Sequence, residues 1–186
     1  MDDAVRTAMI KWPDVPACYG WLSLDRRGQW RLQGEPVRHG GLETFLQRNY
    51  SHDEMGNWFV QNGPQKVFVE LDYAPWVLRL ANESSLVTHT GLAVQNLERA
   101  LLDEEGNLLL LCEHGPALLD DRDLPALLAC MENADGHPAS DDDLLTQMAT
   151  GFGSLFLRWQ QQRIPLESLL RREAAEEFSF IPLPSP

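Results

Sequence analysis

The feature that most constrains this chain is a hairpin pattern in its first third. Apolar and polar residues alternate from Ala17 to Leu32, and Asp25-Arg26-Arg27-Gly28 interrupts the alternation. An alternating pattern predicts strands with one buried face, and the glycine supplies the positive φ that closes a hairpin turn. We therefore expect antiparallel sheet, with Ala74-Pro75 marking an edge or a bulge later in the chain.

The hairpin pattern returns 78 residues later. Leu24-Asp25-x-x-Gly28-x-Trp30-x-Leu32-x-x-Glu35 aligns with Leu102-Asp103-x-x-Gly106-x-Leu108-x-Leu110-x-x-Glu113. After four extra residues a short amphipathic helix also returns, with Leu124, Leu127, Leu128 and Met131 in the places of Leu42, Phe45, Leu46 and Asn49. Two generic hairpin–helix units are the alternative explanation, but a fixed offset favours an internal repeat.

These patterns predict an α+β fold of mainly antiparallel sheet with short helices, built from two related hairpin–helix units. We expect a first unit over residues 1–90 and a second over 91–186, packed as one compact globule. Ser140 or Asp141 caps a further short helix through Met148. Residues 167–177 fit either a helix or the continuation of a strand.

Charge and composition exclude several classes of function. The chain has 15 Lys and Arg against 28 Asp and Glu, a net charge of −13, which repels phosphate backbones and anionic lipid. The apolar runs are too short to span a bilayer, and the acidic start lacks the features of a signal peptide. The three cysteines show no paired spacing. We expect a cytoplasmic protein with free thiols that binds neither nucleic acid nor membrane.

No candidate motif outweighs its structural explanation. Cys112 and His114, with Asp120 and Asp121 nearby, would make an incomplete metal site. Asp120 to Asp123 is better explained as helix capping than as a cation site. Ser51, His52 and Asp53 are adjacent in sequence rather than arranged as a triad, and Gly151-x-Gly153 is too short for a phosphate-binding loop. We expect no catalytic residue, metal or cofactor.

Between residues 20 and 80 the chain resembles a proteobacterial domain-of-unknown-function family, number twelve-eighty-five, or a cousin of it. The resemblance rests on ordered short motifs: Asp25-x-x-Gly28-x-Trp30, Gly34-Glu35-Pro36-Val37, Gly56-x-Trp58-Phe59-Val60 and Val67-x-Val69-x-Leu71-Asp72-x-Ala74-Pro75-Trp76. It implies an α+β fold with structural repeats and a role in signalling. It implies no established activity and no catalytic residues.

The remaining functional candidate is the aromatic segment around Pro75. Tyr73 and Trp76 flank the proline, and Asp72 adds a charge where the strand ends. Aromatic side chains anchor pockets and interfaces, so we expect Asp72, Tyr73 and Trp76 to bind a ligand or partner. Core packing is the competing interpretation. We predict a non-enzymatic binding module with an unknown protein or small-molecule partner; alternatives are an enzyme of unrecognised type and a structural role.

Overall fold

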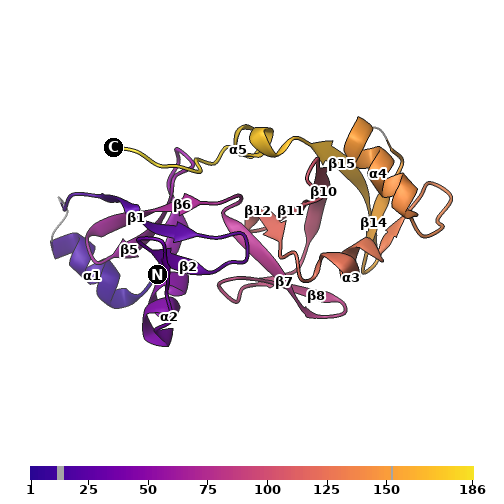
Figure 1. The fold of residues 1–186 in the computed structure, drawn as a ribbon. Coiled ribbons are helices and arrows are strands. Elements are labelled where there is room, and N and C mark those ends of the chain that lie inside the picture. The colour runs from indigo at the N-terminus through magenta and orange to yellow at the C-terminus, as the bar shows by residue number, and fades with distance from the viewer. Residues whose placement is uncertain (12–14, 152) are drawn as a thin grey trace. The chain divides into compact units, whose positions relative to one another are not determined.

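A computed structural model of the protein describes residues 1–11, 15–151 and 153–186, which form two compact units (Figure 1). The first unit comprises residues 1–75 and 178–186, and the second comprises residues 76–177. This division differs from the predicted units of 1–90 and 91–186. The strand that begins at Trp76 pairs with the second repeat, and the C-terminal segment returns to the first.

The first unit is a six-stranded mixed sheet with helices. Its elements in chain order are α1 (Asp3–Lys11), β1 (Cys18–Leu24), β2 (Trp30–Leu32), β3 (Glu35–Pro36), α2 (Gly40–Arg48), β4 (Tyr50–His52), β5 (Trp58–Asn62) and β6 (Gln65–Leu71).

The second unit is a nine-stranded mixed sheet with short helices. Its elements are β7 (Trp76–Asn82), β8 (Ser85–Thr88), β9 (Ala93–Val94), β10 (Leu97–Asp103), β11 (Leu108–Cys112), β12 (Gly115–Leu119), α3 (Leu124–Leu128), β13 (Met131–Glu132), α4 (Asp141–Thr150), β14 (Phe156–Trp159), β15 (Gln162–Leu169), the 3₁₀ helix η1 (Arg171–Glu173) and α5 (Ala174–Glu177). Residues 167–177 thus contain both a strand end and short helices.

Both sheets follow one strand order. The first runs β3-β2-β1-β6-β5-β4, and the second contains the series β12-β11-β10-β15-β14-β13, extended beyond β12 by β7-β8-β9. Each series has a parallel pair at its centre, β1 with β6 and β10 with β15, and antiparallel neighbours on either side. In both, a helix precedes in the chain the strand at one end of the series: α2 precedes β4, and α3 precedes β13. The predicted α+β fold of two related hairpin–helix units is confirmed.

The two series also agree in register at their centres. Leu24 lies between Trp30 on β2 and Leu71 on β6. Its counterpart Leu102 lies between Leu108 on β11 and Ser168 on β15. The predicted offset of 78 residues therefore holds, position for position, across the first two strands of each repeat.

The offset changes in the next hairpin. Glu35 pairs with Leu32, whereas Leu110, the counterpart of Leu32, pairs with Ala117. The predicted match between Glu35 and Glu113 is therefore wrong. Glu113 lies in the turn of a longer hairpin, in which β11 and β12 continue pairing beyond the length of their counterparts.

The helix match is also displaced by one position. Tyr50 and Met131 are each the first residue of the strand that follows the helix. Aligning these two residues makes Leu127, rather than Leu128, the counterpart of Leu46. Leu46 and Leu127 are both buried, at 6% and 1% exposure. Because α3 is shorter than α2, matching apolar spacing alone cannot fix this register.

Among the described residues, one turn geometry occurs four times and explains the Asp-x-x-Gly pattern. In each turn a side-chain oxygen of the first residue accepts hydrogen bonds from the backbone N–H groups two and four residues later. The glycine three residues later has a positive φ between 74° and 84°, which favours glycine. The turns begin at Asp25, Asp53, Asp103 and Asn133.

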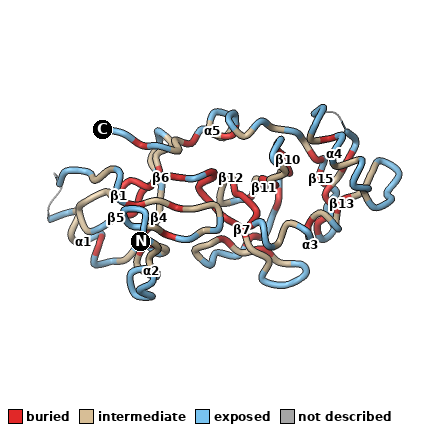
Figure 2. The backbone as a smooth tube through the Cα atoms, viewed as in Figure 1, coloured by how far each residue is buried: buried red, intermediate tan, exposed pale blue. Residues whose placement is uncertain are grey.

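Buried residues follow the central strands of each unit (Figure 2). In the first unit they include Leu22, Leu24, Trp30, Val60, Val69 and Leu71, and in the second Ala100, Leu102, Leu108, Leu110, Leu157 and Leu166. Sheet layers buried in this way account for the apolar alternation in the sequence. Among the described residues, no helix is long and apolar enough to cross a membrane.

The C-terminal segment lies against the Asp53 turn and β6 of the first unit. The Ile181 N–H donates to the Gly56 carbonyl at 2.9 Å, and the Leu71 N–H donates to the Pro182 carbonyl at 2.8 Å. Phe180 is buried beside them. A Cβ on Gly56 would collide with the Ser179 carbonyl oxygen, so the glycine permits this close approach.

Candidate functional site

The structure buries the two aromatic residues of the predicted binding site. Tyr73, in the first unit, is 6% exposed, and Trp76, in the second, is 7% exposed. Asp72 is exposed, and its backbone N–H donates to the Leu24 carbonyl at 3.0 Å. The Arg26 guanidinium lies 5.6 Å from the centre of the Tyr73 ring.

Trp76 has the contacts of a core residue. Its indole Nε1 donates to the His114 carbonyl oxygen at 2.7 Å, and its ring lies against the His89 and His114 rings. The Pro75 carbonyl accepts a hydrogen bond from the Tyr50 hydroxyl at 2.8 Å. These contacts favour core packing, and the binding role of Asp72, Tyr73 and Trp76 stays a prediction.

The acidic stretch before α3 has a different role from the predicted one. Asp123 occupies the N-cap position without a side-chain capping bond, and instead accepts from Arg79 Nε at 2.7 Å. Asp120 is fully buried and forms an ion pair with Arg122. The capping prediction is therefore wrong, because two arginines compete successfully for these carboxylates.

Several other candidate residues form contacts within the chain. His114 Nε2 lies 2.9 Å from the Ala93 carbonyl oxygen, and burial raises the pKa of the Cys112 thiol. Asp53 is committed to its turn. Within the described ranges, no three His, Cys, Asp or Glu side chains gather in a way that could hold a metal ion.

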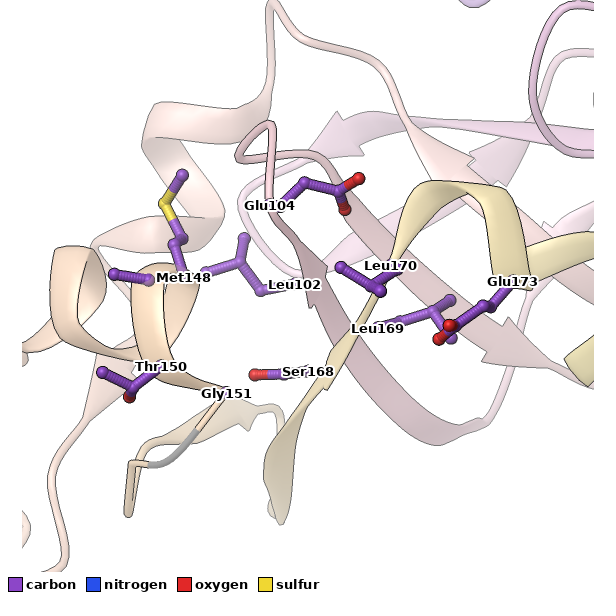
Figure 3. Close-up of a pocket in the computed structure, with 10 residues that line it drawn as sticks. Leu102, Glu104, Met148, Thr150, Gly151, Ser168, Leu169, Leu170 and Glu173 are labelled. Carbon is purple, nitrogen blue, oxygen red and sulfur yellow. The ribbon is translucent and has the colours of Figure 1, made fainter.

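A pocket of about 300 Å³ lies in the second unit, where α4 ends beside β10 and β15 (Figure 3). Its walls come from the last turn of α4, the ends of both strands and η1. The lining residues are Leu102, Glu104, Met148, Ala149, Thr150, Gly151, Ser168, Leu169, Leu170 and Glu173.

The sequence of α4 explains how this wall is fixed. Ser140 and Asp143 form a reciprocal capping box at its start, and Gly151 ends the helix in the left-handed conformation, with φ of 70°. The predicted helix from Ser140 or Asp141 is confirmed. The buried Gln147 side chain donates from Nε2 to the Leu166 carbonyl at 3.1 Å and to Ser168 Oγ at 2.8 Å. These bonds attach α4 to β15 (Figure 1).

The charges around the pocket are negative. Of its ten lining residues, Glu104 and Glu173 are the charged ones. Glu104 Oε2 accepts from the Arg171 backbone N–H at 2.8 Å, while the Arg171 side chain forms an ion pair with Glu105 at 3.1 Å. The last turn of α4 adds the partial negative charge of a helix C-terminus.

The pocket combines apolar walls with a few polar groups, a composition common among small-molecule sites. Met148, Leu169 and Leu170 provide apolar surface, and Thr150 and Ser168 provide hydroxyls. His89, whose pKa burial lowers to about 3, is not among the lining residues.

Sequence reasoning missed this pocket although the signal was present. The Asn133 turn matches the Asp53 turn, yet β14 begins much later after its turn than β5 does after its own. The extra length contains α4. In register, Leu169 and Leu170 stand where the first unit has Asp72 and Tyr73, because Ser168 corresponds to Leu71. Two of the predicted binding residues, Asp72 and Tyr73, thus correspond in register to two residues that line the pocket.

Comparison with known proteins gives a family and a fold. A family model, DUF2944, described as "Protein of unknown function (DUF2946)", matches residues 1–185. A solved DUF1285 protein from Silicibacter pomeroyi DSS-3 is similar at 17% identity and a TM-score of 0.55, over 84% of this chain and 85% of that one.

A second DUF1285 structure, from Shewanella baltica OS155, has 18% identity and a TM-score of 0.41, over 55% of this chain and 85% of that one. The sequence resemblance to DUF1285 or a cousin of it is confirmed at the level of fold. No curated protein matches the chain.

Proposed function

The chain belongs to the DUF2944 family, a family of unknown function, and we propose that it is a non-enzymatic binding module whose ligand site is the α4 pocket. The α4 pocket is the cavity lined by residues 102, 104, 148–151, 168–170 and 173. One observation carries the proposal: α4, which is inserted between β13 and β14 of the second repeat, forms one wall of the pocket.

The repeat shows what the scaffold requires. The first unit completes the same strand series with a direct connection from its Asp53 turn to β5. α4 is therefore an addition to a sheet that the first unit forms without it. Additions held on a rigid scaffold are where binding sites are commonly found.

The addition is also fixed rather than loosely attached. Its start has a capping box, its middle is bonded to β15 through Gln147, and a Cβ on Gly106 would touch Met148 at 3.3 Å. The volume of the α4 pocket, about 300 Å³, is at the lower end for small-molecule sites. A pre-formed pocket of this size suits a small ligand and lowers the entropic cost of binding it.

A fragment screen tests the proposal. We expect small neutral, anionic and cationic fragments, added at millimolar concentration to ¹⁵N-labelled protein, to include binders that shift the amide signals of residues 148–151 and 168–170. Ala149→Trp fills the pocket from the exposed side of α4 and is expected to abolish these shifts.

Leu145→Trp is the matched control. Leu145 is 60% exposed on the same helix and does not line the pocket, so this variant should bind fragments as the natural protein does. Absence of any binder in the screen, or equal loss in both variants, would remove the pocket from consideration.

A cytoplasmic location and a ligand-dependent role are part of the same proposal. The three cysteines are free thiols, which supports a reducing cytoplasm. A role in signalling would use the ligand as its input. An enzyme of unrecognised type remains the alternative, and turnover of a bound fragment in the screen would favour it.

A further inference from the structure

From the charges around the α4 pocket, we infer that its ligand is a small organic cation, an ammonium group carried on a short apolar chain. This inference rests on the proposed binding function and names the class of ligand. The apolar part would lie on Met148, Leu169 and Leu170, with the ammonium group toward Glu104 and Glu173.

The Glu104 carboxylate is the first argument. Several carboxylates of the second unit form ion pairs with arginine, among them Glu105, Glu132, Glu167 and Glu177. Among the described residues, Glu104 has no such ion pair, and its position is set by a backbone N–H instead. Figure 3 shows its side chain at the pocket beside Leu170. A carboxylate held in this way keeps its charge available to a ligand.

The surroundings reinforce this charge. Glu173 lies across Leu170 from Glu104, and its contact with Arg172 is a long one of 3.9 Å between two exposed side chains. The C-terminal turn of α4 forms the opposite wall (Figure 3). Carbonyl groups at a helix C-terminus favour cations.

The first repeat provides the strongest argument, because it fills the corresponding position with its own cation. By the 78-residue offset, Arg26 is the counterpart of Glu104, and Tyr73 is the counterpart of Leu170 in register. In the first unit the Arg26 guanidinium lies 5.6 Å from the Tyr73 ring centre. In the second unit the arginine is replaced by a carboxylate beside a leucine, so the charge at this position is reversed and suits a cationic ligand.

Three probes of equal length test the charge preference: n-butylammonium, n-butanol and butyrate. Titrations of the full chain, followed by the amide signals of residues 148–151 and 168–170, should show n-butylammonium binding about tenfold more tightly than the other two. Raising the salt concentration should weaken it, since exposed charges are screened. A blocked Gly-Lys-Gly peptide that binds more tightly still would support the same class and identify a lysine side chain as its source.

Glu104→Gln keeps the acceptor for the Arg171 N–H and removes the charge. We expect it to weaken n-butylammonium binding about fivefold, the upper range for an exposed ion pair. Glu83→Gln makes the same charge change in an exposed turn away from the pocket and should leave the affinity within about twofold.

Two results would overturn the inference. If n-butanol or butyrate binds as tightly as n-butylammonium, or if Glu104→Gln has no more effect than Glu83→Gln, the ligand is not a cation, although the pocket still binds. If no probe or fragment of any charge binds, the proposed function fails as well.

Discussion

The two repeats share a strand order, a central register and two turns each, yet they differ in charge and in what is added to them. Residues 1–75 and 178–186 contain 10 acidic and 8 basic residues, a net −2, whereas residues 76–177 contain 18 acidic and 7 basic, a net −11. Within the described ranges, α4 and the β7–β9 extension belong to the second unit and have no counterpart in the first. One scaffold thus supports a nearly neutral unit and an acidic unit with a pocket.

The same positions also have different neighbours. Gly56 is covered by the C-terminal segment, while its counterpart Gly136 has no described atom within 4 Å of the place where a Cβ would stand. Arg26 lies over Tyr73, while Glu104 lines a pocket. At these two positions the first unit is contacted by its own chain, whereas in the second unit Gly136 has no described neighbour and Glu104 lines the pocket.

Trp76→Ala should produce the largest change in stability. Trp76 is buried in the β7 extension that only the second unit has, and truncating a core tryptophan costs about 3–5 kcal/mol. Trp21→Ala in the first unit, where the side chain is 51% exposed, should cost far less. Chemical denaturation measures both. A small loss for Trp76→Ala, combined with loss of partner binding, would instead restore Trp76 as a binding residue.

Acid should weaken the second unit through His89, which also lies in its β7–β9 extension. Burial lowers the pKa of His89 to about 3, so the unfolded chain takes up a proton that the folded chain does not between pH 6.5 and 3. Above pH 6.5 His89 is neutral in both states, and the free energy of unfolding keeps its full value. Below pH 6.5 that free energy falls by about 1.4 kcal/mol for each unit of pH.

Unfolding curves at pH 7 and pH 5 test this effect in the natural protein and in His89→Gln, which does not titrate there. The histidine protein should lose about 2 kcal/mol more than the variant over this interval. Equal losses would show that the acid sensitivity arises elsewhere.

Gly56→Ala and Gly136→Ala form a matched pair across the repeats. Both glycines have positive φ, 84° and 81°, so each substitution carries about 1–2 kcal/mol of backbone strain. Only at Gly56 would the new Cβ meet backbone atoms of the C-terminal segment. We expect the larger loss for Gly56→Ala, with faster amide hydrogen exchange at Ile181 and Leu71, whose N–H groups bond across this contact. Equal losses, with no change in exchange, would mean that the segment is not held at this turn.

Ser140→Ala should have the smallest effect. It removes one half of the capping box of α4 and should cost about 1 kcal/mol. The loss should appear as faster hydrogen exchange in α4 and leave the first unit unchanged. Faster exchange in the sheet of the second unit would show that α4 is part of the scaffold rather than an addition to it.

The sequence was sufficient for the features set by local chemistry. The Asp25 and Asp103 turns, the alternating strands around them and the capped start of α4 all depend on residues close together in the chain. Pairings between distant segments were not predictable in this way: nothing near Leu24 specifies Leu71 as its parallel neighbour. The match of Glu35 with Glu113 failed because the β11–β12 hairpin is longer than the β2–β3 hairpin, so the two glutamates share the 78-residue spacing only by chance.

The proposed site was harder to predict for the same reason. Tyr73 and Trp76 have the composition of a binding surface, but burial depends on which strand covers them. Glu104, Met148 and Ser168 come from three separate segments, and none is a defining position of a sequence motif. Their proximity follows only once β10 is paired with β15 and α4 is bonded across them.

The central claim is that the repeats have diverged into a scaffold and a binding unit. Its most direct test is a titration of the ¹⁵N-labelled full chain with n-butylammonium, comparing corresponding amides in the two repeats. The account predicts saturable shifts at residues 102–104, 148–151 and 168–170, and none at residues 24–26 and 71–73. Equal shifts in both repeats, or none in either, would contradict it.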